Sequence, residues 1–431
     1  MLETQTLAAL GAAVAALERE FAALPDAEAP AAPRLDAVLG EVAARLGDNY
    51  PYFHPLYAGQ MLKPPHPVAR AAYALATWIN PNNHALDGGR ASTAMEREAV
   101  AQIAAMFGWQ EHLGHLTGGG TMANLEALWV AGRLRTGKKI AASAQSHYTH
   151  QRISGVLQLP FTKVPTDRRG CMDPNDLEAQ LAAGDIGCVV ATLGTTATGS
   201  VDPLPEILAL RERYGFRVHV DAAYGGYFTL ADNLAPETRA AFDRIAEADS
   251  IVIDPNKHGL QPYGCGCVLF RDPAVGTLYK HDSPATYFSS REMHLGEISL
   301  ECSRPGASAV ALWATMRVLP LVRGGEFAQS LAACRRAALA LDARLRQDSR
   351  FRVPFSPQLD IVVWATKTGS AERIFQEAAR RNLHLALARL PGEFFGDPQP
   401  EVLCLRSVLM KPEHEQWIDR IWQILDQATN A

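Results

Sequence analysis

Apolar and polar positions follow two different periods through the middle of the chain, and the two periods alternate. Short apolar runs typical of buried strands occur at 138–144, 186–194, 216–223, 248–257 and 265–272. Before and between them lie stretches with apolar residues at helical spacing, at 96–107, 118–135, 173–184 and 203–215. Strands that alternate with helices predict right-handed βαβ units and a mostly parallel sheet flanked by helices, an α/β fold.

The two ends of the chain have other patterns. Residues 1–21 repeat apolar positions at helical spacing, and a Pro/Ala-rich stretch and an aromatic, proline-rich lead-in follow them. After a long helical passage at 303–345, the pattern predicts strand, helix, strand and a closing helix. We therefore predict an N-terminal helical and irregular segment (1–67), a large domain (68–320) and a small C-terminal α+β domain (321–431).

Composition narrows the class of protein without identifying it. The 431 residues are 48% hydrophobic and 20% charged with a formal net charge of −5, values typical of a globular protein. No basic stripe or tail is present to neutralise phosphates, so nucleic acid is not expected as a partner. The N-terminus has Glu3 and no basic region, no apolar run reaches membrane length, and the seven cysteines are scattered. These features predict a cytoplasmic protein without a membrane partner.

Chemistry is expected where strands end, because ligands of open α/β sheets bind outside the carboxyl ends of the strands. In the stretch HLTGGGTMANLEAL, Gly118, Gly119 and Gly120 precede Thr121 at the predicted start of a helix. The N–H groups of a helix N-terminus attract anions, and a threonine hydroxyl adds a donor. The alternative is a flexible turn with a threonine N-cap, because the stretch matches neither the P-loop nor G-x-G-x-x-G.

Two charged residues end apolar runs. Asp221 follows VHV and precedes two alanines, so a flat ring can approach and its protonated nitrogen can bind the carboxylate. Considered alone, Asp221 is better explained as a helix N-cap. Lys257 closes a clearly buried strand, where a desolvated amine can form a Schiff base. The alternative for Lys257 is a structural ion pair with Asp254.

Histidines supply the fourth candidate. In SAQSHYTHQR a predicted strand delivers His147, whose imidazole can stack on an aromatic ring or shuttle a proton. His147 and His150, like His112 and His115, are three residues apart, a spacing that a metal pair can use. Neither pair has a carboxylate or cysteine nearby in a ligand pattern, and the GCGC stretch lacks the C-x-x-C spacing of zinc sites, so no metal is expected.

Taken together, the four candidates match the needs of one cofactor. Pyridoxal phosphate needs an anion site for its phosphate, an amine for its aldehyde and commonly an aspartate for its ring nitrogen. An imidazole stacked on the ring completes the set. We therefore predict pyridoxal 5′-phosphate as the cofactor and Lys257, His147 and Asp221 as catalytic residues.

The ordered set of motifs resembles the group II pyridoxal-phosphate-dependent decarboxylases, a fold-type-I family that acts on glutamate, aromatic amino acids, tyrosine and aspartate. The motifs are GGGTMANLEAL, SHYTH, VATLGTTATGSVDPL, HVDAAYGG, DPNKHG, ECSRPGASAVALW and LRSVLM, and the resemblance covers nearly the whole chain. It implies a seven-stranded, mostly parallel sheet and a homodimer with shared active sites. It also implies decarboxylation of an L-amino acid to an amine and carbon dioxide, through a Lys257 aldimine and a quinonoid intermediate.

The resemblance assigns roles to individual residues. Lys257 matches the lysine that carries the cofactor and Asp221 the partner of the ring nitrogen, with Ala223 under the ring and His147 over it. Arg406 matches the arginine that binds the substrate α-carboxylate in glutamate-type members, a task that suits its bidentate fork. The implied cofactor contacts are Gly120, Thr121, His147, Thr196, Asp221, Ala223, Asn256, Lys257 and Ser303, the last reaching the neighbouring subunit's phosphate in some members.

Two features depart from the family pattern. Asn256 occupies the position of a histidine that normally precedes the lysine; its amide can still donate to a phosphate, but proton transfer near the lysine is expected to differ. The segment 279–297 is shorter than the mobile loop of the animal aromatic decarboxylases, and Tyr287 has no secure alignment with that loop's tyrosine.

The alternative functions left open are those of a carbon–carbon lyase, an aminotransferase or aldehyde synthase, and a non-catalytic protein of the same fold. The sequence does not specify the substrate.

Overall fold

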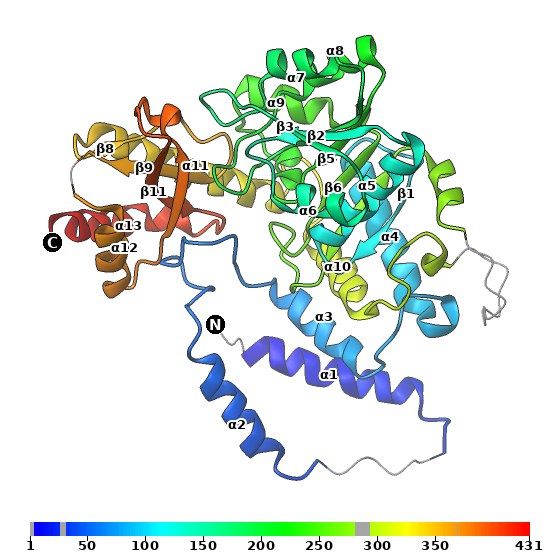
Figure 1. Cartoon of the computed structure of the whole chain (residues 1–431). Helices are drawn as coiled ribbons and strands as arrows, with labels where there is room; N and C mark the ends of the chain where they lie inside the picture. Colours follow the sequence, from blue (N-terminus) through cyan, green and yellow to red (C-terminus); the bar gives the residue numbers. More distant parts are fainter. Residues whose placement is uncertain (1–3, 26–31, 281–293, 368) are drawn as a thin grey trace.

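A seven-stranded sheet forms the centre of the structure, a computed structural model that describes residues 4–25, 32–280, 294–367 and 369–431 (Figure 1). The strand order is β1-β7-β6-β5-β4-β2-β3. The pairs from β6 through β5, β4 and β2 to β3 are parallel, and β7 is antiparallel to both of its neighbours. The strands are β1 (Leu113–Thr117), β2 (Lys139–Ser143), β3 (Phe161–Val164), β4 (Ile186–Thr192), β5 (Arg217–Asp221), β6 (Ser250–Ile253) and β7 (Gly266–Phe270). The predicted mostly parallel α/β sheet is confirmed.

Helices cover both faces of this sheet. One face packs against α5 (Gly120–Leu134) and α6 (Thr149–Val156). The other packs against α4 (Arg90–Met106), α7 (Pro174–Leu181), α8 (Leu204–Tyr214), α9 (Pro236–Asp243) and α10 (Gly306–Val318). In β4, Val189 and Ala191 face the α8 side and Val190 faces the α5 side. Every residue of β4 is buried, which explains why its sequence is a continuous apolar run rather than an alternating one.

Local signals in the sequence set the ends of two of these helices. Asp173 caps α7, because its carboxylate accepts the N–H group of Asn175 at 2.8 Å. Helix α8 ends at Gly215, whose φ of 70° is a left-handed conformation that glycine adopts without a steric penalty. Both ends therefore lie where the sequence predicts them.

The C-terminal part of the chain forms a second core around a small antiparallel sheet of order β10-β11-β9-β8. The long helical passage predicted at 303–345 is two helices, because Pro320 and Gly324 lie in the break between α10 and the next helix. The elements are α11 (Glu326–Gln347), β8 (Phe351–Arg352), β9 (Ile361–Thr366), α12 (Ala371–Arg380), β10 (Ala386–Pro391), β11 (Glu401–Val408) and α13 (His414–Asn430). The domain boundaries at residues 67/68 and 320/321 stay predictions.

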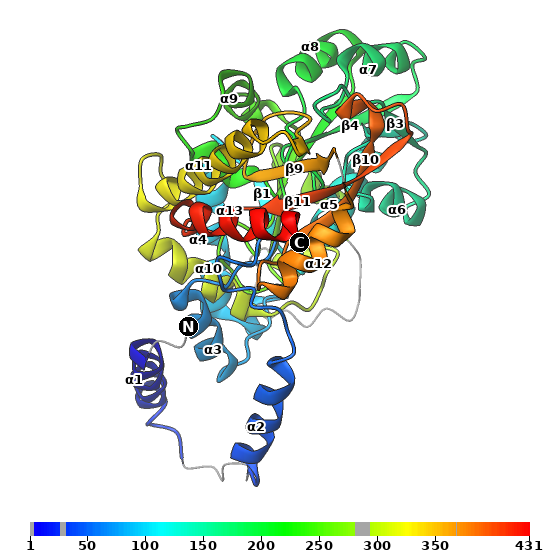
Figure 2. The same ribbon diagram turned by 90° about the vertical axis from the view of Figure 1, so that its left-hand side faces the viewer.

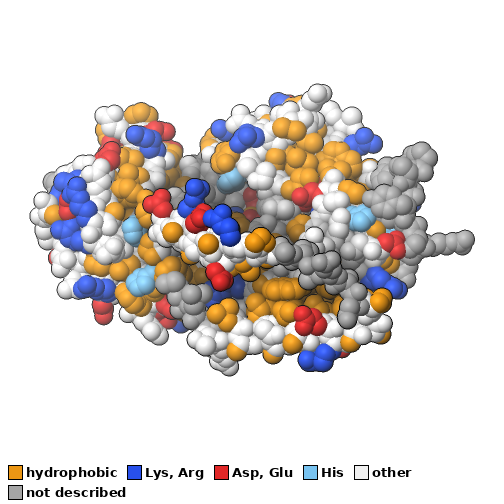
Figure 3. Space-filling view, turned by 90° about the horizontal axis from the view of Figure 1, so that it is seen from below, with side chains coloured by type: hydrophobic (Ala, Val, Ile, Leu, Met, Phe, Trp, Pro, Cys, Tyr) orange, Lys and Arg blue, Asp and Glu red, His pale blue; other side chains and the backbone are white. Residues whose placement is uncertain are grey.

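The N-terminal helices lie outside both cores. Helix α1 (Thr4–Glu20) lies along α3 (Pro67–Thr77), whereas α2 (Leu35–Leu46) projects from the body in both ribbon views (Figures 1 and 2). No residue of α2 is buried. Its large apolar side chains are nevertheless spaced for one face of a helix, at Leu35, Val38, Leu39, Val42 and Leu46. Figure 3 views the molecule from this side and shows hydrophobic side chains on the surface there.

A fully buried carboxylate joins the two cores. Asp360 immediately precedes β9 of the C-terminal sheet. Its Oδ1 accepts a 2.6 Å hydrogen bond from the Tyr224 hydroxyl, and its Oδ2 lies 3.2 Å from His258 Nε2. Tyr224 follows β5 and His258 follows β6, so the C-terminal part of the chain is attached directly to the carboxyl ends of the central strands.

We expect Asp360→Asn to lower the free energy of unfolding by about 2–4 kcal/mol, because it removes the charge from a buried hydrogen-bonded group. The matched control is Asp419→Asn, which breaks an exposed pair with Arg344 and is expected to cost less than about 1 kcal/mol. Urea unfolding curves of the two variants give the comparison. Equal midpoints would show that Asp360 does not hold the cores together.

Candidate active site

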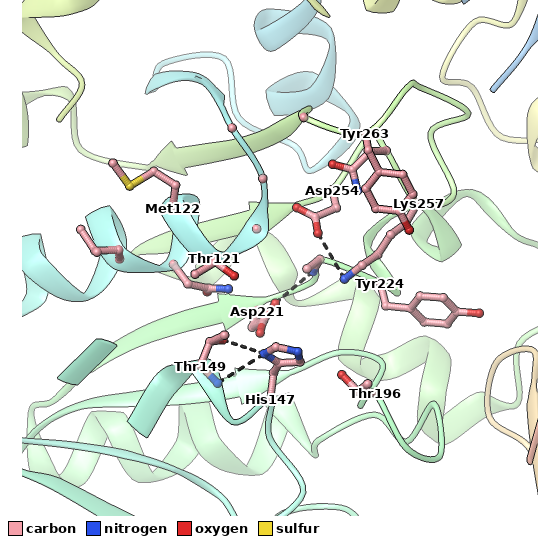
Figure 4. Close-up of a pocket in the computed structure, with 18 of the residues that line it drawn as sticks. Thr121, Met122, His147, Thr149, Thr196, Asp221, Tyr224, Asp254, Lys257 and Tyr263 are labelled. Atoms are coloured by element: carbon pink, nitrogen blue, oxygen red, sulfur yellow. Dashed lines mark hydrogen bonds and ion pairs between the residues drawn. The ribbon is translucent and has the colours of Figure 1, made fainter. Parts of the chain in front are cut away.

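A cavity of about 500 Å³ opens at the carboxyl ends of the parallel strands (Figure 4). The turn before α5, the loop that follows β2 and the ends of β4, β5 and β6 all contribute to its lining. The predicted cofactor residues that line it are Gly120, Thr121, His147, Thr196, Asp221, Ala223, Asn256 and Lys257. Residues scattered over more than 130 positions of the sequence are thus brought together at one edge of the sheet.

One end of the cavity is built to receive an anion. Helix α5 begins at Gly120, and Thr121 also lines the cavity. The first N–H groups of the helix and the Thr121 hydroxyl can therefore donate hydrogen bonds to an anion. Two glycines here have no room for a side chain: a Cβ on Gly120 would lie 2.6 Å from Asp254 Oδ2, and one on Gly266 of β7 would lie 2.5 Å from the carbonyl carbon of Gly119. Gly119 itself has a φ of 148°, which other residues rarely adopt. The triple glycine is therefore a tightly packed turn and not a flexible one.

Two further groups border this end. Glu301 accepts the N–H group of Gly118 at 2.8 Å, which leaves the N–H groups of Gly120 and Thr121 to an incoming anion. Asn256 uses its Oδ1 to accept the N–H group of Cys265 at 3.2 Å, so its amide nitrogen is the donor that remains. An asparagine at the position of the family's histidine therefore keeps a donor beside the cavity.

Asp221 is the last residue of β5 and is 4% exposed. Its Oδ1 accepts the N–H group of Ala223 at 3.1 Å, and its Oδ2 lies 2.8 Å from Nε2 of His150. Burial opposes ionisation of this carboxyl, but the hydrogen bond and charge of His150 and the charge of Lys257 outweigh it and hold the pKa of Asp221 well below its usual range. The cavity therefore contains a carboxylate that is ionised at neutral pH and suited to a protonated ring nitrogen.

Lys257 follows β6 and extends into the cavity (Figure 4). Its Nζ lies 3.2 Å from Oδ2 of Asp254. Burial raises the pKa of Asp254, with the charge of Lys257 acting in the opposite direction. The two interpretations of Lys257 from the sequence, a Schiff-base amine and an ion pair with Asp254, are thus compatible, because the amine has this partner and also faces the cavity.

The tautomer of His147 follows from its neighbours. Thr149 donates its backbone N–H to Nδ1 of His147 at 3.3 Å, and its hydroxyl lies 2.7 Å from the same atom. Nδ1 must therefore accept both, which places the ring proton on Nε2, on the side away from Thr149 (Figure 4). Burial lowers the pKa of His147, so the ring is neutral at pH 7 and presents an N–H donor.

The structure separates the two histidines that the sequence offers as a metal pair. His147 binds Thr149, whereas His150 lies beneath the site and binds Asp221. His150 is a residue behind the cavity to which the motifs assign no role. His147 precedes α6, whereas His150 lies in its first turn, and the two side chains have different partners.

Two predicted site residues lie outside the cavity lining. Arg406, in β11, is 4% exposed and donates to the carbonyl groups of Thr196, Ala197 and Gly59 at 2.7, 3.0 and 2.8 Å. It therefore holds the loop that carries Thr196, and its contact with substrate stays a prediction. Ser303 lies on the surface, where its hydroxyl accepts a hydrogen bond from Asn82; its contact with a neighbouring subunit also stays a prediction. Tyr287 lies outside the described residues.

These groups fit pyridoxal phosphate. The helix N-terminus suits its phosphate, the Lys257 amine its aldehyde, the Asp221 carboxylate its ring nitrogen and the His147 imidazole a ring face. Fold and cavity together define a fold-type-I enzyme of this cofactor.

The chain belongs to the pyridoxal-dependent decarboxylase family, whose conserved domain matches residues 20–367. An L-tyrosine decarboxylase of Enterococcus faecium is 29% identical over 385 residues, covering 66% of this chain and 63% of that protein. A probable L-tyrosine/L-aspartate decarboxylase of Methanopyrus kandleri is 28% identical, covering 77% of this chain and 88% of that protein. The chain thus spans less than two thirds of the Enterococcus relative.

Solved structures share the fold. The crystal structure of mouse CSAD superposes with a TM-score of 0.80 at 19% identity, covering 96% of this chain and 91% of that one. A structure of Oryza sativa TDC with PLP and tryptamine gives the same TM-score at 20% identity and the same coverage. The predicted fold-type-I architecture and the predicted cofactor are confirmed.

We expect Thr149→Val to weaken cofactor binding about tenfold, because it removes the hydroxyl that fixes the His147 ring. Thr149→Ser is the matched control, since it keeps the hydroxyl, and it is expected to bind within about twofold of the parent. Absorbance titration of cofactor-free protein with pyridoxal phosphate measures both dissociation constants. Equal constants for the two variants would show that Thr149 does not orient His147.

Proposed function

We propose that this protein is a carboxy-lyase that uses pyridoxal phosphate to decarboxylate an L-amino acid, releasing carbon dioxide and an amine. The observation that carries this proposal is the placement of the ionised Asp221 and the Lys257 amine in one cavity. Relatives named as L-tyrosine decarboxylase and as aspartate 1-decarboxylase support the reaction class. Pyridoxal phosphate, when bound, supplies an electron-withdrawing ring that weakens the bonds to the substrate Cα.

Each residue of the site is proposed to have a separate role. Lys257 would supply the amine that holds the aldehyde of the cofactor. Asp221 keeps the ring nitrogen protonated, because an ionised carboxylate stabilises a positive charge beside it. His147 holds a neutral ring and an N–H donor over the same site, and the start of α5 anchors the phosphate.

Arg406 is proposed to bind the substrate α-carboxylate. Three of the five guanidinium N–H groups are used by the carbonyl groups around Thr196 and Gly59, so two remain, one on each terminal nitrogen. Those two are the pair that a carboxylate binds in bidentate fashion. The same three bonds would hold the guanidinium rigidly for this purpose.

A neutral side chain suits the cavity better than an acidic one. Among the described residues that line it, Lys257 is the only lysine or arginine, whereas Asp221, Asp254 and Glu301 supply carboxylates. A substrate with a second carboxylate would find no cation for it there, and buried like charges repel. Between the tyrosine and aspartate of the relatives' names, we therefore propose a neutral, tyrosine-like substrate.

We expect Lys257→Ala to lose both the absorbance of bound cofactor above 400 nm and at least about 99% of the carbon dioxide release, because no other amine can replace it. The parent protein is first tested against a panel of L-amino acids, with carbon dioxide and product amine measured together. Lys138→Ala, which changes an exposed lysine bonded to the Gly184 carbonyl, is the control and is expected to keep both signals.

The panel also separates the alternatives. Release of carbon dioxide with an aldehyde in place of the amine would indicate an aldehyde synthase. Cofactor absorbance with no carbon dioxide from any amino acid would indicate a lyase or an aminotransferase. Full turnover by Lys257→Ala would contradict the proposal itself.

We further propose a homodimer in which α2 is covered by a second copy. Five large apolar side chains of this helix are 45–62% exposed in the single chain, on one face and without a partner in the described part of the structure.

A reducing compartment such as the cytoplasm is proposed from the seven cysteines, all of which are unpaired thiols. None of the described helices is both long and apolar enough to cross a membrane.

We expect the double change Val38→Asp and Val42→Asp to weaken the dimer at least about 100-fold, because it buries two charges in the apolar face of α2. The control is Ala37→Asp with Ala44→Asp, which adds the same charge to the opposite side of the same helix. Sedimentation velocity over a range of concentrations measures both. A dimer of equal strength in the two variants would show that α2 is not at the interface.

A further inference from the structure

We infer that His150 is a positioning residue for Asp221: its Nε2–H holds the carboxylate in place and keeps it ready for the ring nitrogen of the cofactor. The inference rests on the proposed function only in that the Asp221 carboxylate serves a pyridoxal phosphate ring. It adds a residue that the sequence motifs leave without a role.

The contact between the two side chains is short and wholly internal. His150 is 0% exposed, and its Nε2 lies 2.8 Å from Oδ2 of Asp221. The second oxygen of the carboxylate accepts the Ala223 N–H at 3.1 Å. Each oxygen thus has one fixed donor, and the carboxylate cannot rotate without losing both. Its remaining lone pairs are left for a donor in the cavity, which Asp221 lines.

The ring of His150 has one described polar partner. Its Nδ1 is buried and makes no hydrogen bond, so the imidazole is not engaged in a wider polar network. A carboxylate can only accept, so Nε2 must carry a proton. Burying the unpaired Nδ1 costs free energy. The hydrogen bond from Nε2 to Asp221 is the polar interaction that offsets this cost.

Packing fixes the ring in the direction of Asp221. His150 lies in the first turn of α6. Thr149, Ile153 and Ser154 of the same helix are also buried, and α6 packs against α5. The same turn orients His147 through Thr149. One turn of helix therefore controls both the group proposed to stack on the cofactor ring and the carboxylate that meets its nitrogen.

A second buried histidine near His150, His219, does not compete for Asp221. The ring of His219 lies 6.4 Å from that of His150, but its own nitrogens are bound to Ser250 Oγ at 2.9 Å and Asn124 Oδ1 at 2.8 Å. Burial lowers the pKa of His219 to about 3, so it is neutral. Lys257, Asp254 and His147 lie on the cavity side of the carboxylate. The buried Asp202, which accepts the N–H groups of Met172 and Thr192, also interacts with Asp221 electrostatically.

A double-mutant cycle between His150 and Asp221 tests the inference. His150→Phe removes the donor and keeps a flat ring, and His150→Gln keeps an N–H donor. Each is made in the parent and in Asp221→Asn, and the dissociation constant for pyridoxal phosphate is measured with cofactor-free protein. In the parent we expect His150→Phe to weaken binding about 10- to 100-fold and His150→Gln less than about fivefold. In Asp221→Asn, His150→Phe should change it less than about twofold.

A second readout needs no cofactor. In the proton NMR spectrum of the cofactor-free protein, the Nε2 proton of His150 should give a strongly downfield imidazole signal, because it is bonded to a buried carboxylate. We expect that signal to be absent in His150→Phe and shifted upfield in Asp221→Asn. The matched control is His414→Phe, another buried histidine, which lies outside the cavity lining and should leave both the signal and the cofactor affinity unchanged.

The outcomes distinguish this inference from the proposed function. Equal losses of affinity from His150→Phe in both backgrounds, or an unchanged NMR signal in Asp221→Asn, would overturn the positioning role and leave a packing role only. Coupling in the cycle with no decarboxylation of any amino acid by the parent would instead overturn the proposed function and support the role of His150. Retention of normal affinity by His150→Phe in the parent would also overturn the inference.

Discussion

A carboxylate buried at the end of a strand is the constraint on which the rest of the site depends. Asp221 is nearly inaccessible to water, and burial alone would favour its neutral form. Three groups reverse that preference: the imidazole of His150, the N–H of Ala223 and the charge of Lys257. They come from α6, from the turn after β5 and from the loop after β6. The charge is therefore stable only when sheet, helix and turns are assembled together.

The same sheet edge joins the two cores, so the geometry of the cavity depends on both. Tyr224 and His258, which closely follow Asp221 and Lys257 in the sequence, contact Asp360 of the C-terminal part. Arg406, from the same part, binds the carbonyl groups of the loop that carries Thr196. These loops are thus held by buried polar contacts from the second core.

The sequence predicts those features that depend on local pattern. Continuous apolar runs end at Asp221 and just before Lys257, and the rule that ligands bind at the carboxyl edge then brings both into one site. What the sequence does not predict depends on tertiary packing. The bond from His150 to Asp221 joins residues 71 positions apart, and the guanidinium of Arg406 is occupied by carbonyl groups about 210 positions away. Main-chain acceptors carry no sequence signal, so no motif could have indicated them.

Two buried aspartates flank the same lysine, and their environments move their pKa values in opposite directions. Burial dominates at Asp254 and raises its pKa, with Lys257 as the compensating charge. At Asp221 a histidine and a main-chain N–H add to that compensation, and the pKa is lowered. A difference of this kind assigns different roles to chemically identical groups. Asp221 stays charged whether or not Lys257 is engaged elsewhere, because its two fixed donors do not depend on the lysine. At Asp254, Lys257 Nζ lies 3.2 Å from Oδ2, and the buried Oδ1 has no hydrogen-bond partner among the described residues. Lys257 is therefore paired with the carboxylate that has fewer hydrogen-bond donors.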